Sequence, residues 1–223
     1  IDGLRGISII AVVLFHAFPN IFKNGYIGVD YFLVISGFVI SKNYLVGENK
    51  FNFEEFWIKR IKRLFPPLII CIFVISPFAY YLMNTDNFEN FLQSIISSLL
   101  GLNNILLLIT SGYWNTANDF KPLYTTWSLG LEEQFYLLLS FLLIFCDIKK
   151  SNKKFLKYII IFSILSYLIC FTGSFNLPTF HYLMLPARLW EFTIGVFASY
   201  LSSKKLVIPK SISILAATNV ILF

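Results

Sequence analysis

The chain has 223 residues, of which 57% are hydrophobic and only 13% are charged. Soluble globular domains carry roughly 25% charged residues, so this composition excludes an ordinary water-soluble domain. The formal net charge of +6 lies in clusters beside apolar segments and not on one polar face, which excludes a nucleic-acid-binding protein.

Eight stretches are long and apolar enough to be transmembrane segments, since a span needs roughly 20 apolar residues. In chain order they are residues 4–22, 27–45, 66–83, 92–110, 128–147, 155–173, 181–202 and a last stretch from about 207. We therefore predict an all-α, polytopic helical bundle with seven to eight hydrophobic segments. We expect residues 1–223 to form a single membrane domain that continues past Phe223.

Lysine and arginine gather in three clusters, which the positive-inside rule assigns to the cytoplasmic side. The clusters lie within residues 50–63, 149–157 and 204–210. Three predicted spans separate the first two clusters, although a return to the same side needs an even number. Either residues 111–127 contain a short extra crossing, or the stretch 92–110, which is rich in serine and asparagine, is a re-entrant or interfacial segment.

The cysteines offer no metal site. Cys71, Cys146 and Cys170 lie in apolar segments without the spacing of metal ligands. We expect them to be small core residues, and we expect neither a bound metal ion nor a bound cofactor.

His16 is one of only two histidines and lies inside the first predicted span. Arg5 precedes it by eleven residues, which at ~100° per residue puts both side chains on one helix face, roughly 16 Å apart along the axis. We expect Arg5 at the membrane edge and His16 near the middle of the hydrocarbon core. Ionisable groups in spans usually line a pathway, so a functional role is favoured over the alternative, a hydrogen-bonded tie between helices.

Two further motifs carry polar candidates. Asp30 and Ser36 interrupt the apolar stretch "GVDYFLVISGF", where ordinary helix packing is the favoured explanation for Ser36. In "FWIKRIKRLFPPL", Arg60 and Arg63 are neighbours on a helical turn. This segment is either an amphipathic surface helix attracted to anionic lipid or a clamp for a phosphorylated ligand.

Carboxylates enter two later spans. Glu132 and Glu133 are adjacent at the start of the fifth span, so they point about 100° apart, and we expect one to face a polar interior and the other the interface or a partner. The alternative is that both glutamates simply lie near the first turn of the helix, where the helix dipole favours acidic side chains. Arg188 and Glu191 have the spacing of an intrahelical ion pair.

Five motifs follow one another from residue 2 to about residue 201. They read "DGLRGISIIAVVLFHA", "GVDYFLVISGF", "RIKRLFP", "SGYWNTANDFKPLYTTWSLGLEEQFYLL" and "RLWEFTIGVFAS". Together they resemble the membrane acyltransferase-3 family of bacterial O-acyltransferases. The resemblance implies that Arg5 and His16 form the family's arginine–histidine signature. One departure is the motif "PLYTTW", in which Thr125 stands where many relatives have a histidine.

The resemblance implies an enzyme of the bacterial cytoplasmic (inner) membrane that acylates, most often acetylates, a sugar of a cell-envelope or exported polysaccharide such as lipopolysaccharide or peptidoglycan. It implies acyl-CoA as the donor substrate, a glycan as the acceptor and the lipid bilayer as the surroundings, and it associates the pair matched by Arg60 and Arg63 with the donor. A sugar hydroxyl is a poor nucleophile at neutral pH, and the His16 imidazole can serve as general base or transient acyl carrier.

The motifs and the resemblance together give a set of candidate site residues. The candidate catalytic residues are His16, Glu132 and Glu133, and the candidate substrate-binding residues are Arg5, Asp30, Ser36, Arg60, Arg63, Trp127, Arg188 and Glu191. The alternative function is a membrane transporter or flippase, whose buried charges line a translocation path. Paired broken helices and an internal repeat would favour that alternative.

Overall fold

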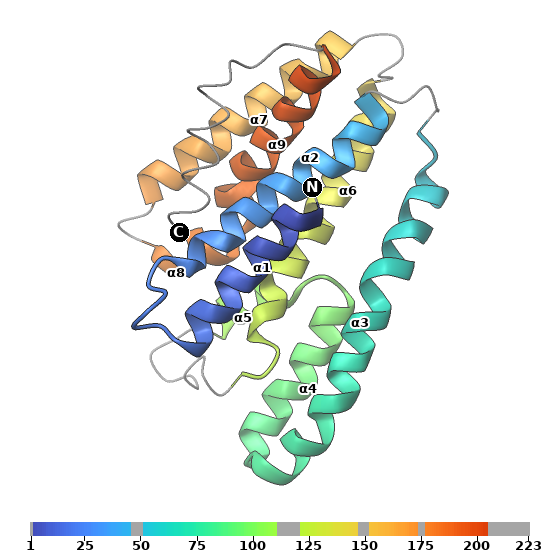
Figure 1. Ribbon diagram of the computed structural model, residues 1–223. Helices are drawn as coiled ribbons and strands as arrows, with labels where there is room; N and C mark the ends of the chain where they lie inside the picture. Colours follow the sequence, from blue (N-terminus) through green and yellow to red (C-terminus); the bar gives the residue numbers. More distant parts are fainter. Residues whose placement is uncertain (1, 46–50, 111–120, 147–151, 174–176, 205–223) are drawn as a thin grey trace. The chain divides into compact units, whose positions relative to one another are not determined.

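The structure of the chain is a computed structural model (Figure 1), and it describes residues 2–45, 51–110, 121–146, 152–173 and 177–204. Within these ranges every regular element is a helix, which confirms the all-α prediction. Four helices are long and apolar enough to cross a membrane, namely Gly25–Leu45, Phe53–Leu82, Tyr124–Cys146 and Lys153–Thr172. The predicted number of seven to eight spans is therefore not confirmed. The last predicted span, residues 111–120 and the basic residues 149 and 150 lie outside the described residues.

The chain divides into two compact units. The first contains α1 (Asp2–Ala17), η1 (Gly25–Ile27), α2 (Gly28–Leu45), the start of α7 (Asn152–Gly173) and most of α9 (Leu185–Ser203). The second contains α3 (Phe53–Leu82), α4 (Thr85–Leu99), α5 (Asn103–Ile109), η3 (Tyr124–Thr126), α6 (Trp127–Cys146), the end of α7, α8 (Pro178–Leu183) and the first residues of α9.

The first helix is shorter than predicted. α1 ends at Ala17, whereas the hydropathy of the sequence predicted a span over residues 4–22. Phe18 precedes Pro19, and a proline disfavours the helical conformation in the residue before it. His16 therefore lies in the last turn of α1, and its expected depth in the membrane stays a prediction.

In the first unit, α1 and α2 lie side by side (Figure 1). A Cβ atom at Gly28 would collide with the carbonyl oxygen of Ser8, and one at Gly25 would collide with that of Ala11. Glycine at these two positions lets the backbone after α1 return against it. Gly28 therefore allows the close approach of α2 to α1.

A second close contact joins α2 to α9. A Cβ atom at Gly37 would collide with the backbone of Phe192, and one at Gly195 would collide with the carbonyl oxygen of Val34. Small residues at such contacts allow membrane helices to approach closely and gain van der Waals packing. Gly37, like Gly28, therefore has a packing role.

Replacing Gly37 by alanine is expected to destabilise the first unit, because the new methyl group meets the α9 backbone. Overpacking of this kind costs about 1–3 kcal/mol, and the measurement is the midpoint of unfolding in detergent. Gly3→Ala is the matched control, since nothing lies within 4 Å of a Cβ at that position, and its midpoint should stay equal or rise. Equal losses in the two variants would contradict the close contact between α2 and α9.

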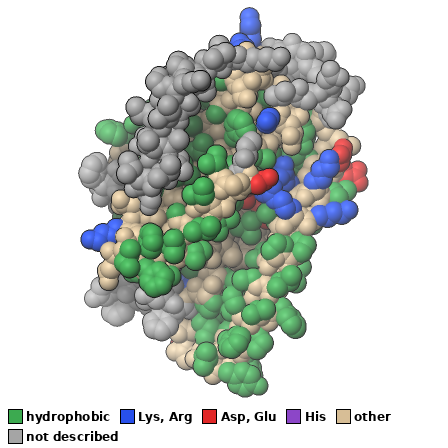
Figure 2. Space-filling view, in the orientation of Figure 1, with side chains coloured by type: hydrophobic (Ala, Val, Ile, Leu, Met, Phe, Trp, Pro, Cys, Tyr) green, Lys and Arg blue, Asp and Glu red, His purple; other side chains and the backbone are tan. Residues whose placement is uncertain are grey.

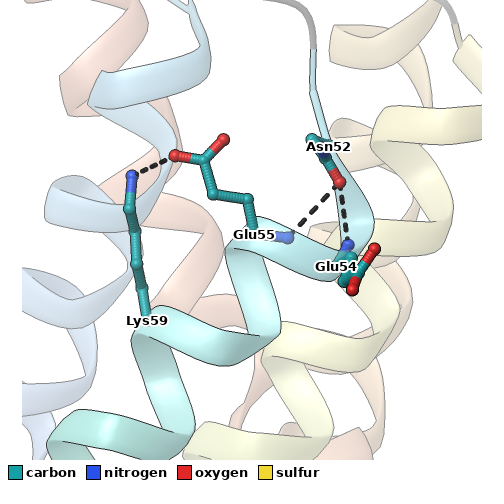
Figure 3. A network of polar contacts seen from close by, with 4 residues as sticks. All are labelled: Asn52, Glu54, Glu55 and Lys59. Atoms are coloured by element: carbon teal, nitrogen blue, oxygen red, sulfur yellow. Dashed lines mark hydrogen bonds and ion pairs between the residues drawn. The ribbon is translucent and has the colours of Figure 1, made fainter.

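In the second unit, α3 is one helix of 30 residues that joins the basic segment to the third predicted span. Asn52 caps it, since its Oδ1 accepts hydrogen bonds from the backbone N–H groups of Glu54 (3.0 Å) and Glu55 (3.3 Å) (Figure 3). A helix of this length measures about 45 Å, longer than the ~30 Å hydrocarbon core of a bilayer. Figure 2 shows charged side chains at the start of α3 and hydrophobic ones along the rest of the α3–α4 hairpin.

The polar stretch 92–110 is not one helix. α4 ends at Leu99, Gly101 adopts a positive φ of 67°, and α5 begins at Asn103. Glycine adopts this conformation at little cost and often ends a helix in this way. The stretch that the charge pattern singled out is therefore broken in the middle, and whether it crosses the membrane stays a prediction.

The predicted span 181–202 is also broken. α8 ends at Leu183, Met184 is extended, and α9 begins at Leu185. Pro186 stands at the second position of α9, where a proline needs no N–H partner within the helix.

The cysteine prediction is confirmed only in part. Cys146 is buried, Cys170 is half-buried and Cys71 is exposed, and all three are free. The prediction is wrong for Cys71 because it lies on the outward apolar side of α3.

Candidate functional site

Arg5 is anchored to α2 within the first unit. Its Nη2 donates a hydrogen bond to the Ser36 hydroxyl (3.1 Å), and its guanidinium carbon lies 5.5 Å from the centre of the Phe32 ring. Ser36 is buried, and its role in substrate binding stays a prediction. Two of the predicted substrate-binding residues are thereby in direct contact.

His16 has a different environment. Its side chain is exposed within the first unit, and its ring meets that of Phe15 edge-on at 5.2 Å. A small apolar pocket of about 140 Å³ lies between α1, η1 and α2. The pocket is lined by Leu4, Ile7, Ser8, Ala11, Asn24, Gly28, Tyr31 and Ile35. His16 is not one of these residues, and a polar cavity shared by His16 and Arg5 stays a prediction.

In the second unit, Arg60 is held between two aromatic rings. Its guanidinium carbon lies 5.3 Å from the centre of the Phe56 ring and 5.2 Å from the centre of the Tyr136 ring. The two rings are nearly perpendicular, at 88°, with centres 6.2 Å apart. Contact with an aromatic ring face stabilises a cation by about 0.5–2 kcal/mol. The orientation of Arg60 is therefore fixed by α3 and α6 together.

Arg63 lies one turn further along α3 and faces Glu132. The distance from Arg63 Nη2 to Glu132 Oε1 is 3.9 Å, and the two side chains are 40% and 2% exposed. The same carboxylate oxygen accepts a hydrogen bond of 2.6 Å from the Tyr136 hydroxyl. Tyr136 stands midway along α6, so the arginine pair lies beside the middle of an apolar helix and not at its end.

The lysines of the same cluster point elsewhere. Lys59 forms an exposed ion pair of 2.6 Å with Glu55 (Figure 3), and Lys62 is exposed. Among the four basic residues of this segment, it is therefore Arg60 and Arg63 that contact α6.

Glu133 and Gln134 point toward the break between α4 and α5. A Cβ atom at Gly101 would collide with the Glu133 carboxylate. Gln134 Nε2 donates hydrogen bonds to the Gly101 carbonyl (3.0 Å) and to Asn104 Oδ1 (2.8 Å), and Asn104 Nδ2 donates to the Leu183 carbonyl (2.9 Å). The two adjacent carboxylates therefore serve different sides of α6, as their spacing predicted.

Other polar groups of the broken stretch also pair inside the second unit. Asn103 Nδ2 donates to the Leu123 carbonyl (3.0 Å) and to Thr126 Oγ1 (2.7 Å), and the Ser98 and Thr126 hydroxyls are 2.8 Å apart. Ser98 and Asn103 are buried. The polar side chains that distinguish this stretch in the sequence form hydrogen bonds that join α4 and α5 to the segment just before α6.

Trp127 and Arg188 meet in the same unit. The guanidinium carbon of Arg188 lies 5.6 Å from the Trp127 ring centre and 5.3 Å from that of Tyr182, and its Nε donates to the Tyr182 carbonyl (3.1 Å). Glu191 is buried in α9 and Asp30 is half-buried in the first turn of α2. The predicted pairing of Arg188 with Glu191 stays a prediction.

The structure therefore forms three groups from the predicted residues, one of which is the contact of Trp127 with Arg188. Arg5 and Ser36 meet in the first unit, while Arg60, Arg63 and Glu132 meet in the second. His16 and the two carboxylates belong to different units, and their approach stays a prediction. Among the described residues, no group of three His, Cys, Asp or Glu side chains is placed to hold a metal ion.

Sequence reasoning missed Phe56, Tyr136 and Tyr182. Phe56 is four residues before Arg60, and Tyr136 is four residues after Glu132. Residues four apart share a helix face, so this spacing could have identified both. The sequence holds no comparable signal for Tyr182, which reaches Trp127 only through tertiary structure.

Comparisons with known proteins agree on one family. A family model described as "Acyltransferase domain" (Acyl_transf_3) matches residues 1–223. The peptidoglycan O-acetyltransferase OatA of Listeria monocytogenes is 34% identical over 171 residues, which are 74% of this chain and 27% of that protein. A Staphylococcus aureus protein provisionally named as an O-acetyltransferase is 32% identical over 158 residues, or 69% of this chain and 26% of its own.

A third relative covers more of the chain. The Komagataeibacter xylinus protein BcsY, provisionally named as a membrane-bound transacylase, is 31% identical over 207 residues, or 92% of this chain and 52% of its own. This chain thus spans about a quarter of the length of the first two relatives and about half that of the third. No solved structure matches the chain.

Proposed function

The chain belongs to the acyltransferase-3 family, and from this membership we propose that it is a multi-pass membrane O-acyltransferase. In the proposed reaction an acetyl group passes from acetyl-CoA to a hydroxyl group of a cell-envelope or exported polysaccharide. The names of the relatives support this choice, since two are O-acetyltransferases by name and one of these names peptidoglycan. We assign the protein to the bacterial cytoplasmic membrane, where one face meets cytoplasmic acyl-CoA.

The observation that supports an acyl-CoA donor is the arginine pair of α3. Arg60 contacts the Tyr136 ring and Arg63 faces Glu132, both on α6, whereas Lys59 pairs with Glu55 of its own helix. Coenzyme A carries phosphate groups, and guanidinium groups offer forked donors that match phosphate oxygens. We assign Arg63, which is 40% exposed, to direct phosphate contact, with Arg60 beside it.

His16 is the proposed general base. It accepts the proton of the acceptor hydroxyl as that oxygen attacks the thioester carbonyl, and the proton then passes to the departing coenzyme A thiolate. A transient acyl group on the imidazole would reach the same products in two steps. Glu132 or Glu133 would orient the imidazole and stabilise its charged form.

The transporter alternative gains one feature from the fold, because α4–α5 and α8–α9 are broken helices. Breaks of this kind line substrate paths in transporters. Here the buried amides and carbonyls beside both breaks hydrogen-bond to one another within the second unit. Family membership favours acyl transfer.

The proposal is tested with the purified full-length protein in lipid nanodiscs, acetyl-CoA labelled in the acetyl group, and soluble peptidoglycan fragments or other bacterial polysaccharides. We expect free coenzyme A thiol to appear together with an alkali-labile acetyl ester on the glycan. Omission of the glycan should remove the ester. Absence of ester with every polysaccharide offered, or movement of unmodified glycan across a vesicle membrane, would contradict the proposal.

A further inference from the structure

Tyr136 contacts Arg60, one arginine of the pair, and also Glu132, the carboxylate that faces the other arginine. Its side chain is 1% exposed, its hydroxyl donates a 2.6 Å hydrogen bond to Glu132 Oε1, and its ring face lies 5.2 Å from the guanidinium carbon of Arg60. A hydrogen bond of this length to a carboxylate is of the strong, charge-assisted kind. The hydroxyl therefore fixes the position of the Glu132 carboxylate along α6.

That position leaves Arg63 only loosely paired. Glu132 Oε1 is 3.9 Å from Arg63 Nη2, beyond the roughly 2.7–2.9 Å of a charge-assisted N–H···O bond. A fully formed arginine–carboxylate pair is bidentate and uses the same forked donors that would bind a phosphate. A carboxylate free to close this gap would therefore compete with an anionic ligand for Arg63.

We propose that Tyr136 is a positioning residue whose hydroxyl holds Glu132 away from Arg63 and so keeps the Arg63 guanidinium available to a phosphate group of the donor. The inference rests on the proposed function, because it takes coenzyme A as the ligand of Arg63. The ring of Tyr136, with Phe56, keeps Arg60 in place, so the hydroxyl and the ring have separable roles.

The experiment measures coenzyme A binding by the full-length protein in nanodiscs, using calorimetry. Tyr136→Phe keeps the ring but removes the hydrogen bond that the hydroxyl donates to Glu132, and we expect Kd to rise about tenfold, the scale of one charge-assisted hydrogen bond to Arg63. Glu132→Gln keeps the shape of the side chain without its charge, and we expect Kd to stay equal or fall. The double variant should bind like Glu132→Gln alone, because a neutral amide cannot neutralise Arg63.

This rescue separates positioning from packing. A merely structural role of the hydroxyl would weaken binding equally with glutamate or glutamine at position 132, and that result would overturn the inference. Tyr81→Phe, at a side chain that is 82% exposed, is the matched control and should bind like the unchanged protein.

Three other outcomes also decide whether the inference holds. Should Tyr136→Phe fail to fold, weaker binding by Glu132→Gln alone would still overturn the inference, and unchanged or tighter binding would support it. Equal Kd values for the unchanged protein and Tyr136→Phe overturn the inference but leave the donor assignment intact. Failure of the unchanged protein to bind coenzyme A overturns the donor assignment and the inference together.

Discussion

Replacing His16 by glutamine is expected to lower the rate of acetyl transfer at least 100-fold, while the protein still inserts in the membrane and binds coenzyme A. General acid–base catalysis by a positioned side chain contributes about 10²–10⁴-fold. Glutamine keeps a hydrogen-bonding side chain but cannot take up a proton at neutral pH. The measurement is the rate of ester formation at saturating acetyl-CoA.

The structure indicates that this loss will not come from unfolding. The His16 side chain is exposed in the last turn of α1, and among the described residues no hydrogen bond or ion pair is formed by its ring. A hydrogen-bonded tie between helices is therefore not found in that part of the chain. Substitution at an exposed site without such contacts usually changes stability by less than about 0.5 kcal/mol.

The matched control is the other histidine of the chain. His181 is half-buried in α8, and His181→Gln should keep most of the activity. Near-normal turnover by His16→Gln would refute the assignment of His16 as base or acyl carrier, and so would equal losses in the two variants.

Replacing both Arg60 and Arg63 by alanine is expected to raise the KM for acetyl-CoA at least 100-fold. Each lost charge-assisted contact is worth about 1.5–3 kcal/mol, or roughly 10- to 100-fold. We expect Arg63→Ala alone to produce most of this effect, because Arg63 is the more accessible donor. Initial rates over a range of acetyl-CoA concentrations give KM and kcat separately.

Two controls distinguish phosphate contact from other causes. Lys59→Ala with Lys62→Ala removes the same charge from neighbouring exposed positions of α3, and its donor KM should change less than about threefold, since exposed charges are screened. Arg60→Ala also removes contacts with Phe56 and Tyr136, so Arg60→Lys, which keeps the charge, reports on folding. Equal effects of the lysine and arginine pairs would show that the cluster acts only through its net charge or on lipid.

The sequence by itself determined the class of protein and much of its helical content. Hydropathy predicted spans over 27–45, 128–147 and 155–173, and the structure has α2, α6 and α7 there within a few residues. Transfer of apolar side chains from water is a local and nearly additive quantity, so a window along the chain can measure it. The same local measure predicted too long a helix at α1, because Pro19 ends the helix within a stretch that is still apolar.

The sequence also predicted that Glu132 and Glu133 would face different ways, because the helical repeat fixes the angle between adjacent residues. It could not assign the partners that lie far away in the chain. The structure sets Glu132 near Arg63 of α3 and Glu133 against Gly101. Those contacts join residues about 70 and 30 positions apart in the chain.

Tertiary structure decided which polar groups are functional candidates and which are structural. Ser98, Asn103 and Asn104 made one stretch look interfacial, yet they are buried and hydrogen-bonded inside the second unit. Likewise, Arg60 and Arg63 are distinguished from the neighbouring lysines only by their contacts with Tyr136 and Glu132 of α6. The physical reason is that a buried polar group must find a partner, and the fold, not the neighbouring sequence, supplies that partner.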